Sequence, residues 1–291
     1  MSARDAKADE PAYAFAEPRE PPCPPLLAAK DYAAPSVFQA RNLLREARRQ
    51  KHLAEAPVPA ICLLDPDGDV VRLLGERGRG EQSGNWACYH TDLLEFTHAG
   101  MRMGAVARAV GGAFAVLVAE QLFASGCELL VSVTSAGRLQ PGAPEAAFVL
   151  IERALRDEGT SYHYLPPAAF ACVDPALAEA VGEALGHAGF LLQRAGTWTT
   201  DAPFRETESA IARARALGLV GVEMEAAALY AFAAARRCPV VCFAHLTNEL
   251  AQVAGDFEKG KDEGLNEVLS ILGACRAAWA RNGRGRAAEE F

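Results

Sequence analysis

The sequence predicts an α/β fold built as one large domain, and three observations lead to this prediction. The chain has 291 residues, enough for one α/β domain with a full core, and a division into two small domains is less favoured. Apolar runs such as 129–137 and 239–246 are typical of buried strands, and they alternate with longer helical patterns. Hydrophobic residues make up 51% of the chain and charged residues 23%, which is ordinary for an enzyme in aqueous solution.

Charge and composition exclude several other classes of protein. The net charge of −8 argues against nonspecific binding of nucleic acid. The uncharged stretch near the middle of the chain is far too short to span a bilayer, and residues 1–25 are charged and proline-rich, unlike a signal peptide. Eight cysteines without a CxxC pair indicate free thiols in a reducing compartment. We therefore expect a cytoplasmic protein with no nucleic-acid, membrane or metal partner.

The expected elements begin after a proline-rich segment with little apolar periodicity. We expect residues 1–34 to form a flexible arm, residues 35–281 the domain and residues 282–291 a flexible tail. Ser36 is expected to cap a basic amphipathic helix that runs to Ala54. The other expected elements are strands over 58–64, 86–98, 103–110, 129–137, 148–155, 217–222 and 239–246, and helices over 113–124, 175–187, 226–235 and 265–280, with a further helix from Thr207.

A turn, a further strand and a loop complete the order of elements that we expect along the chain. Asp65 to Asp69 forms a turn rich in Asp, Pro and Gly, and Val70 to Leu74 is expected to be the returning strand of a hairpin. Residues 255–262 are expected to form a mobile loop before the last helix.

The most informative stretch joins an expected strand to an alanine-rich helix. The apolar run 217–222 leads directly into Glu223, Met224 and Glu225, and alanine, the best helix former, dominates the next ten residues. In open α/β folds ligands bind beyond the carboxyl ends of the strands, where these carboxylates are expected to lie. A carboxylate in the first turn of a helix is also favoured by the helix dipole, so a structural role stays open at this point.

The segment from Val222 to Tyr230, Val-Glu-Met-Glu-Ala-Ala-Ala-Leu-Tyr, resembles the ribose-binding signature of the nucleoside phosphorylase family. That family includes purine nucleoside phosphorylases, uridine phosphorylases and related nucleosidases. The resemblance implies that Glu225 holds the ribose 2′- and 3′-hydroxyls and that Met224 packs on the sugar, with Glu223 beside them. A carboxylate on the diol would orient the ring and stabilise the positive charge that develops when the N-glycosidic bond breaks.

Two further segments resemble the part of the family's site that holds the base. Residues 197–207, Thr-Trp-Thr-Thr-Asp-Ala-Pro-Phe-Arg-Glu-Thr, resemble the base-side loop, which implies that Phe204 stacks on the base and Arg205 binds its edge. Asn248 follows the last expected strand, where many purine-cleaving members have an aspartic acid that protonates the base. Because an amide cannot protonate the base in this way, we expect Asn248 to hydrogen-bond the leaving base, with a plain turn residue as the alternative.

Three segments carry the phosphate-binding candidates. Residues 129–137 resemble the central phosphate strand, and Ser135 matches its pattern. Gly112 stands at a helix start that resembles the family's first crossover, where backbone N–H groups can bind an anion. Residues 68–72 match the Gly-Asp-x-x-Arg pattern of the family's phosphate loop, which makes Arg72 a candidate for binding phosphate. A hairpin in which Arg72 faces solvent is the favoured alternative.

The phosphate strand also contains a departure from the family pattern, because Ser132 stands at its arginine position. A unit charge pair at about 4 Å and an effective dielectric constant near 20 is worth roughly 4 kcal/mol, which corresponds to about a thousandfold in affinity. Either water replaces phosphate as the nucleophile, or another arginine takes over this role, with Arg72, Arg138, Arg156 and Arg205 as candidates.

Over residues 58–280 the resemblance implies a three-layer αβα sandwich with a mixed, partly barrel-like central sheet. The implied activity is phosphorolysis of a nucleoside to a free base and ribose or deoxyribose 1-phosphate, a pentosyltransferase reaction of nucleoside salvage. It uses inorganic phosphate as co-substrate and needs no metal or organic cofactor. Hydrolysis by a nucleosidase and nucleoside binding without turnover stay open as alternatives.

The resemblance also implies a homodimer or a hexamer built as a trimer of dimers. Family members often place a neighbour's histidine at the 5′-end of the sugar. The candidates for this histidine are His52, His90, His98 and His163.

Overall fold

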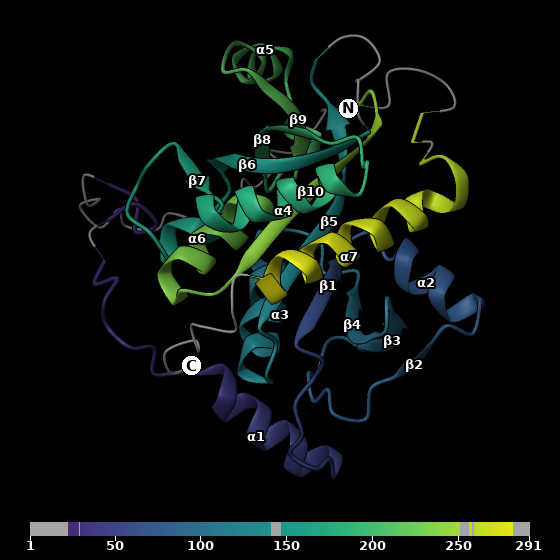
Figure 1. Cartoon of the computed structure of the whole chain (residues 1–291). Helices are drawn as coiled ribbons and strands as arrows, with labels where there is room; N and C mark the ends of the chain where they lie inside the picture. Colours follow the sequence, from purple (N-terminus) through teal and green to yellow (C-terminus); the bar gives the residue numbers. More distant parts are fainter. Residues whose placement is uncertain (1–22, 29, 141–146, 251–255, 258, 282–291) are drawn as a thin grey trace, which may run out of the picture.

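A mixed ten-stranded sheet runs through the part of the chain that the structure describes (Figure 1). The structure is a computed structural model, and it describes residues 23–28, 30–140, 147–250, 256–257 and 259–281. The strands are β1 (Ile61–Asp65), β2 (Gly80–Gln82), β3 (Leu94–His98), β4 (Met101–Ala107), β5 (Leu129–Arg138), β6 (Phe148–Asp157), β7 (Phe170–Cys172), β8 (Gln193–Thr200), β9 (Leu219–Glu223) and β10 (Val240–Asn248).

Part of this sheet closes on itself. The strand order is β10-β6-β8-β9-β5-β1-β4-β3-β2, β7 pairs with β6, and β10 also pairs with β5. The five strands β5, β10, β6, β8 and β9 therefore form a closed circuit, while β1, β4, β3 and β2 extend from β5 as an open sheet. Parallel and antiparallel pairs both occur, so the mixed, partly barrel-like sheet implied by the sequence is confirmed.

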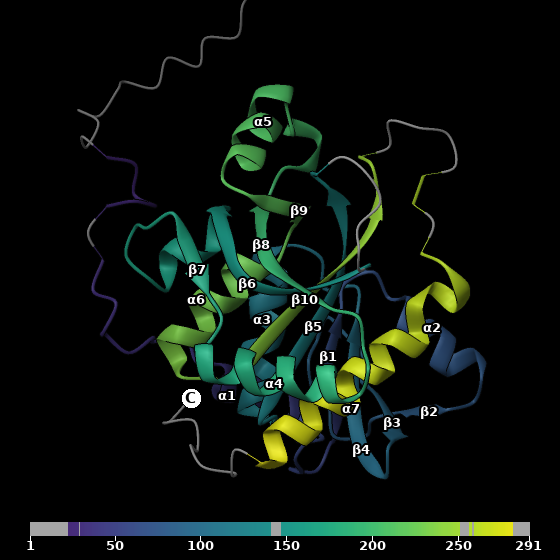
Figure 2. The same ribbon diagram turned by 45° about the horizontal axis from the view of Figure 1, so that its top comes forward.

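Helices cover both faces of the sheet and give the three-layer arrangement. The helices are α1 (Ala40–Lys51), α2 (Asp69–Glu76), α3 (Gly112–Ala124), α4 (Pro175–His187), α5 (Glu208–Ala216), α6 (Ala226–Arg236) and α7 (Leu265–Arg281), with short 3-10 turns η1 (Thr160–His163), η2 (Pro203–Arg205) and η3 (Lys261–Gly264). Figure 1 shows α4 and α7 across the near face of the sheet, where they pack together, while α3 packs on α6 and α1. In Figure 2, α5 lies at the top, beyond β9.

The alanine-rich helix α6 packs unusually close to its neighbours. Every residue of α6 from Ala226 to Phe232 is buried, and a Cβ added to Gly112 of α3 would lie 2.8 Å from Cβ of Ala228. The Tyr230 hydroxyl donates to the Ile151 carbonyl (2.5 Å) and accepts from the Cys242 N–H (3.0 Å), which ties α6 to β6 and β10. Small residues therefore bring the start of α6, and the carboxylates before it, directly against the sheet.

The hairpin predicted over residues 65–74 is wrong, because Asp69–Glu76 is the helix α2. Gly68 has a φ of 86°, and the buried Asp65 carboxylate accepts hydrogen bonds from the Gly68 and Val71 N–H groups at 3.1 and 3.0 Å. These bonds satisfy donors of the first helical turn, as an N-cap does. The buried pair Val70 and Leu74 is spaced i, i+4, a pattern that fits a helix as well as a half-buried strand.

Several other expected boundaries also change. Ser36 is not a helix cap: α1 begins at Ala40, and the Ser36 hydroxyl donates to the Phe38 carbonyl. The strand expected over 86–98 is reduced to β3, because the Trp86 indole donates to Thr91 within a loop. The sequence patterns did not predict β2, β7 or β8, and the first four residues of the 197–207 motif belong to β8. The other predicted strands and helices are confirmed to within a few residues.

Some predictions concern residues that the structure does not describe. The predicted tail and most of the predicted N-terminal arm lie outside the described residues, as do parts of the loop expected over 255–262. Within the described ranges, no helix combines the length and the apolar character that crossing a bilayer requires. All eight cysteines are free thiols, and six of them are buried.

Candidate active site

A cavity of about 340 Å³ lies where the carboxyl ends of several strands meet. The ends of β5, β9 and β10 and the loop after β1 line it, together with the loops before α3 and α5. Of the residues predicted for the site, the cavity brings together Ser135, Phe204, Glu223, Met224, Glu225 and Asn248. Arg72, Gly112 and Arg205 are absent from its described lining.

Glu225 combines deep burial with an incomplete set of partners. Its side chain is at the start of α6, and one carboxylate oxygen, Oε1, accepts a hydrogen bond from the Gly111 N–H at 2.7 Å. The other oxygen, Oε2, is buried without a well-aligned partner among the described residues, although Thr134 is beside it. Burial raises the pKa of Glu225 to about 8, the nearby charge of Glu223 adds to this shift, and the Gly111 bond opposes it.

Glu223 is buried as well, but four hydrogen bonds satisfy its carboxylate. Oε1 accepts from the hydroxyls of Thr197 and Thr199 on β8, at 3.0 and 2.5 Å. Oε2 accepts from the N–H groups of Glu225 and Ala226, at 2.8 and 2.7 Å. Because these bonds favour the charged form of Glu223, we assign the shared negative charge to Glu223 and the proton to Glu225. Glu223 thus caps α6 and positions Glu225, and its direct contact with a substrate stays a prediction.

A carboxylate already occupies the polar groups of Ser135. The Ser135 N–H and hydroxyl both donate to Asp67, each at 2.9 Å. Lys259 lies 3.0 Å from the Asp67 carboxylate and 2.6 Å from that of Asp69. Asp67 therefore takes the position in which a phosphate was expected to accept from Ser135. The sequence pattern did not single out Asp67, because the predicted turn over residues 65–69 was given no role in the site.

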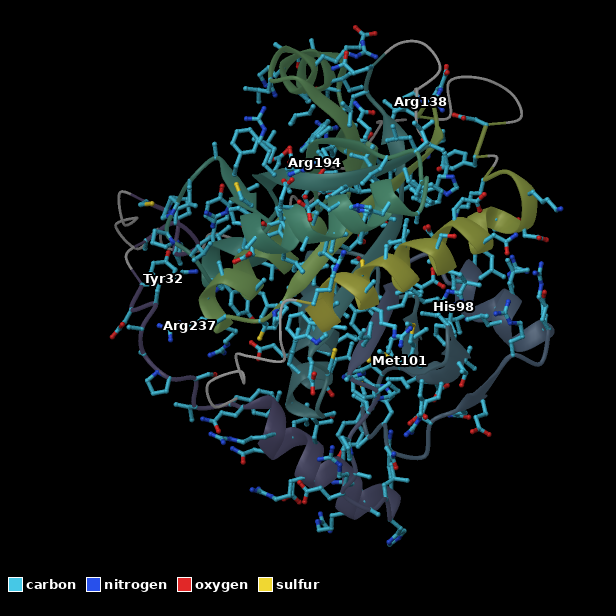
Figure 3. The ribbon with its side chains drawn as sticks, in the orientation of Figure 1. Tyr32, His98, Met101, Arg138, Arg194 and Arg237 are labelled. Carbon is cyan, nitrogen blue, oxygen red and sulfur yellow. The ribbon has the colours of Figure 1, made fainter. Side chains whose placement is uncertain are left out.

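None of the four candidate arginines reaches the described lining of the cavity. Arg72 pairs with Asp69 and Glu76 on the surface of α2, at 3.2 and 3.3 Å. Arg138 lies at the upper edge of the molecule in Figure 3, where it contacts Glu249 at 3.5 Å.

The other two arginines are also placed elsewhere. The buried Arg156 donates to Ser161 and to two backbone carbonyls, and Arg205 is exposed in η2. The described lining contains neither lysine nor arginine, whereas its carboxylates are Asp67, Glu206, Glu223 and Glu225.

The mouth of the cavity is apolar and open. Phe204 is 100% exposed, Phe257 56% and Val110 50%, and the half-buried Met224 lies among the lining residues. Such exposed aromatic side chains offer flat surfaces for stacking a base. Phe204 and Met224 were predicted, whereas nothing in the sequence pattern singled out Phe257.

Two polar side chains accompany these aromatic groups. Asn248 is buried, its amide N–H donates to the Thr247 hydroxyl (3.2 Å), and its oxygen accepts from the Leu250 N–H (3.0 Å). Glu206 lines the cavity, and burial raises its pKa. Glu206 follows Arg205 in the motif over residues 197–207. The sequence prediction named Arg205, and not Glu206, as the residue that binds the edge of the base.

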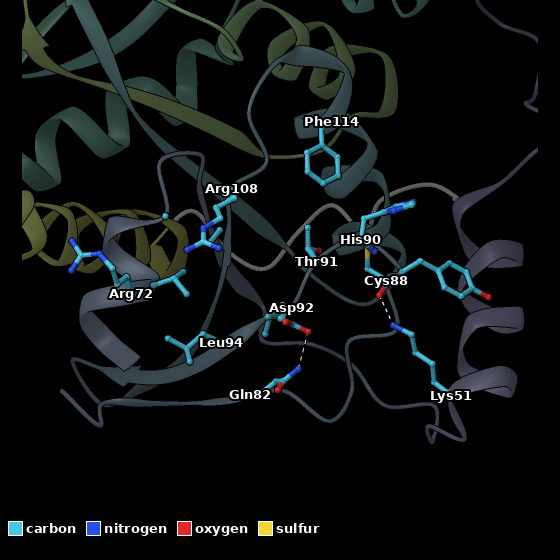
Figure 4. A pocket seen from close by; sticks show the side chains of 15 residues that line it. Lys51, Arg72, Gln82, Cys88, His90, Thr91, Asp92, Leu94, Arg108 and Phe114 are labelled. Atoms are coloured by element: carbon cyan, nitrogen blue, oxygen red, sulfur yellow. Dashed lines mark hydrogen bonds between the residues drawn. The ribbon is translucent and has the colours of Figure 1, made fainter. Parts of the chain in front are cut away.

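The four candidate histidines lie elsewhere in the fold. His52 ends α1, His163 lies 3.0 Å from Lys30, and Figure 3 shows His98 near α7. His90 lines a second cavity, which Figure 4 shows. Across the described ranges, no group of three or more His, Cys, Asp or Glu side chains is arranged to hold a metal ion.

Comparison with known proteins agrees with this fold. Residues 60–275 match the sequence model of the phosphorylase superfamily. An AMP nucleosidase from Bacteroides thetaiotaomicron is similar, with a TM-score of 0.66 and 16% identity over 84% of this chain and 99% of that one. A purine nucleoside phosphorylase from Toxoplasma gondii has a TM-score of 0.64 and 14% identity, over 79% of this chain and 94% of that one.

A third structure of this kind comes from Campylobacter jejuni. Its 5′-methylthioadenosine/S-adenosyl homocysteine nucleosidase has a TM-score of 0.59 and 15% identity, over 75% of this chain and 99% of that one. A search of curated proteins finds no match. At such low identities these structures show the fold alone, but the family model covers most of the sequence. The chain therefore belongs to the phosphorylase superfamily, the group of nucleoside phosphorylases and nucleosidases that its sequence motifs predicted.

Proposed function

We propose that this protein cleaves the N-glycosidic bond of a nucleoside unit and that water, rather than phosphate, is the nucleophile. The products are a free base and a free pentose. The observation that carries the proposal is the position of Asp67, whose carboxylate accepts both hydrogen bonds that Ser135 offers. Both phosphorylases and nucleosidases occur among the similar structures, so the family leaves the nucleophile open.

Electrostatics favours water in this cavity. Asp67 and the charged Glu223 line it, and its described lining has no lysine or arginine to offset the charge of an inorganic phosphate, because Lys259 contacts Asp67 from outside that lining. A like-charge pair at about 4 Å with an effective dielectric constant near 20 costs roughly 4 kcal/mol. Water carries no charge and meets no such cost. Phosphorolysis would require Asp67 to leave Ser135 and a distant arginine to enter the cavity.

Asp67 is well placed to activate the water. Ser135 and Lys259 hold its carboxylate, so the group is oriented before the substrate arrives. In the proposed step the water oxygen bonds to C1′ of the sugar while its proton passes to Asp67. The bond between C1′ and the base nitrogen breaks at the same time, and the base leaves with the bonding electron pair and takes up a proton from solvent.

Other side chains hold the two halves of the substrate. Glu225 binds the sugar diol through its unpartnered oxygen, and the single negative charge of the Glu223–Glu225 pair, which Glu223 carries, stabilises the positive charge developing on the ring. Phe204 and Phe257 stack on the base, and Asn248 hydrogen-bonds it. No step in this scheme uses a metal or an organic cofactor. We further propose that the protein acts in the cytoplasm as a homo-oligomer.

The nucleophile can be identified from the products. The wild-type protein is incubated with purine and pyrimidine nucleosides and nucleotides, with and without inorganic phosphate, and the released base and pentose are quantified. We expect base release without phosphate and a pentose that carries no new phosphate at C1′. A requirement for phosphate, with pentose 1-phosphate as product, would reject hydrolysis. Absence of base release from every compound would reject catalysis and leave a nucleoside-binding role, which stabilisation against heat by nucleosides would reveal.

A matched pair of substitutions tests the role of Asp67. Asp67→Asn removes the proposed base, and Asp69→Asn removes the neighbouring carboxylate that also contacts Lys259 but does not line the cavity. We expect Asp67→Asn to lower kcat about 10²–10⁴-fold, the usual contribution of a general base, and Asp69→Asn to keep most of the activity. Equal losses in the two variants would show that Lys259 pairing, rather than proton transfer, explains the effect.

A further inference from the structure

A second cavity of about 580 Å³ lies beside the candidate active site (Figure 4). The end of α1, the helix α2, the loop before β3 and the start of α3 surround it. Two loops separate it from the first cavity. Asp67 lines the first cavity and Gly68 the second, and in the next loop Val110 lines the first and Arg108 the second. The two cavities therefore adjoin at these two loops.

The second cavity differs from the first in its charge. Its described lining contains three cations, Lys51, Arg72 and Arg108, against one carboxylate, Asp92, which already accepts a hydrogen bond from Gln82 at 2.8 Å. The Thr91 hydroxyl and the His90 ring add polar groups to the lining, and Figure 4 shows Arg108 between Arg72 and His90 in the view. The first cavity thus disfavours an anion, whereas the second is suited to one.

Arg108 is the cation in this cavity that has a free guanidinium. Lys51 donates to the Cys88 carbonyl at 2.5 Å, and Arg72 pairs with two acidic side chains on α2. The exposed Arg108 guanidinium, in contrast, makes no hydrogen bond or ion pair with a described residue. A planar guanidinium without a protein partner is suited to two parallel hydrogen bonds with a phosphoryl group.

The chain is folded so that Arg108 can lie over the β1–α2 turn. A Cβ added to Gly68 would be 3.1 Å from Cγ of Arg108, so a larger residue at position 68 would crowd this side chain. The Arg108 N–H donates to the Asp65 carbonyl at 2.9 Å, which joins the two loops. Three residues later, the Gly111 N–H holds Glu225. Arg108 and the backbone group that holds the proposed sugar anchor therefore belong to one short segment, residues 108–111.

We propose that the second cavity binds the phosphoryl group of the substrate and that the substrate is a nucleoside 5′-monophosphate, cleaved to a base and ribose 5-phosphate. This inference rests on the proposed function. Because Glu225 holds the 2′- and 3′-hydroxyls there, the 5′-oxygen is the remaining position on the sugar that can carry the phosphate. The two cavities adjoin at residues 67–68 and 108–110, so the 5′-phosphate lies on the side of Arg108 while the sugar and base occupy the cavity without cations.

Kinetics on paired substrates tests this assignment. Each of adenosine, guanosine, uridine and cytidine is compared with its 5′-monophosphate, and the kcat/KM for base release is measured. We expect the wild-type protein to prefer at least one monophosphate over its nucleoside by about tenfold or more, the size of a charge-assisted hydrogen bond. The preference should decrease as ionic strength rises, because an exposed guanidinium is screened by salt.

Variants at position 108 connect that preference to one side chain. Arg108 has a φ of 63°, so Arg108→Asn is chosen because asparagine tolerates this left-handed backbone. We expect Arg108→Asn to lower kcat/KM about tenfold for the monophosphate while kcat/KM for the nucleoside stays unchanged, and Arg108→Lys to restore part of the loss. Arg41→Ala, which removes an exposed arginine on α1 that contacts the Gln39 side chain, serves as the matched control.

Each other outcome has a distinct meaning. If nucleosides are cleaved but monophosphates are no better, or if Arg108→Asn lowers both equally, the phosphate assignment is wrong while the proposed function stands. If neither class of compound releases base, the proposed function fails as well. Inorganic phosphate should inhibit monophosphate cleavage competitively. If it instead accelerates nucleoside cleavage in a manner that requires Arg108, the cavity holds a co-substrate and the assignment is overturned.

Discussion

At the scale of single residues, two neighbouring glutamates have opposite roles because their hydrogen bonds differ. Glu223 accepts four hydrogen bonds, whereas Glu225 accepts one from Gly111 and has an oxygen without a well-aligned partner. Two adjacent buried carboxyl groups cannot both be charged without a large cost, so one of them keeps a proton near neutral pH. The hydrogen bonds decide that this is Glu225, the group that is free to bind a ligand.

The protonation of Glu225 predicts how stability depends on pH. Its pKa is raised from 4.5 to about 8 in the folded state, so the folded protein binds this proton more tightly than the unfolded chain. Stability therefore decreases as pH rises from about 5 to 8, with a contribution from Glu225 of at most about 1.4 kcal/mol per pH unit. Urea unfolding across this range should show a steeper loss in the wild-type protein than in Glu225→Gln. Identical slopes would contradict the raised pKa.

At the scale of elements, the junction between β9 and α6 positions the site. Strand β9 delivers Glu223 to the carboxyl edge of the sheet, and its carboxylate then caps the first turn of α6 and binds two threonines of β8. One side chain thus joins three elements. The direction of the Glu225 side chain depends on this junction, because Glu225 is the residue at which α6 starts.

The junction makes Glu223 a residue whose loss should be costly. Glu223→Ala leaves two backbone N–H groups and two buried hydroxyls without their acceptor. We expect this change to lower the free energy of unfolding by about 2–4 kcal/mol, measured by urea denaturation. The control is Glu208→Ala in the first turn of α5, an exposed position where a change within about 0.5 kcal/mol is expected. Similar effects in both variants would mean that Glu223 is not a structural junction.

At the scale of the whole molecule, Lys259 brings distant parts of the chain together at one side of the candidate active site. The lysine precedes α7 and is 14% exposed, while its partners Asp67 and Asp69 lie at the β1–α2 loop, about 190 residues earlier in the sequence. Its single positive charge lies between two carboxylates that would otherwise repel each other, and it helps to hold Asp67 beside Ser135. The closed circuit of five strands places β5 and β10 side by side, which brings Ser135 and Asn248 into the same cavity.

Removing this lysine should affect stability and activity together. Lys259→Met removes the ion-pair partner of Asp67, while Asp69 keeps Arg72, and we expect a loss of about 2–3 kcal/mol in unfolding free energy. Base release should also fall, because Asp67 would no longer be held in position. The matched control is Lys261→Met, which removes an exposed lysine from the same segment. If both variants have wild-type stability and activity, the Lys259 bridge has no role in organising the site.

The amino-acid sequence by itself determined the elements whose signals are local. Uninterrupted apolar runs predicted β5 and β10, helical spacing predicted α4, and alanine content predicted α6. The motif around Glu225 predicted the family and a carboxylate at the junction between a strand and a helix. These features depend on neighbouring residues along the chain, so they can be recognised before the chain is folded.

Only the tertiary structure decided which groups meet across the site. The same residues 70–74 fit a strand or a helix, and the capping of α2 by Asp65 settles the question in favour of the helix. That helix places Asp67 on Ser135, and Lys259 then balances its charge from the other end of the chain. The proposal that water is the nucleophile rests on this long-range arrangement of charges, because electrostatic energy follows distances in space rather than positions along the sequence.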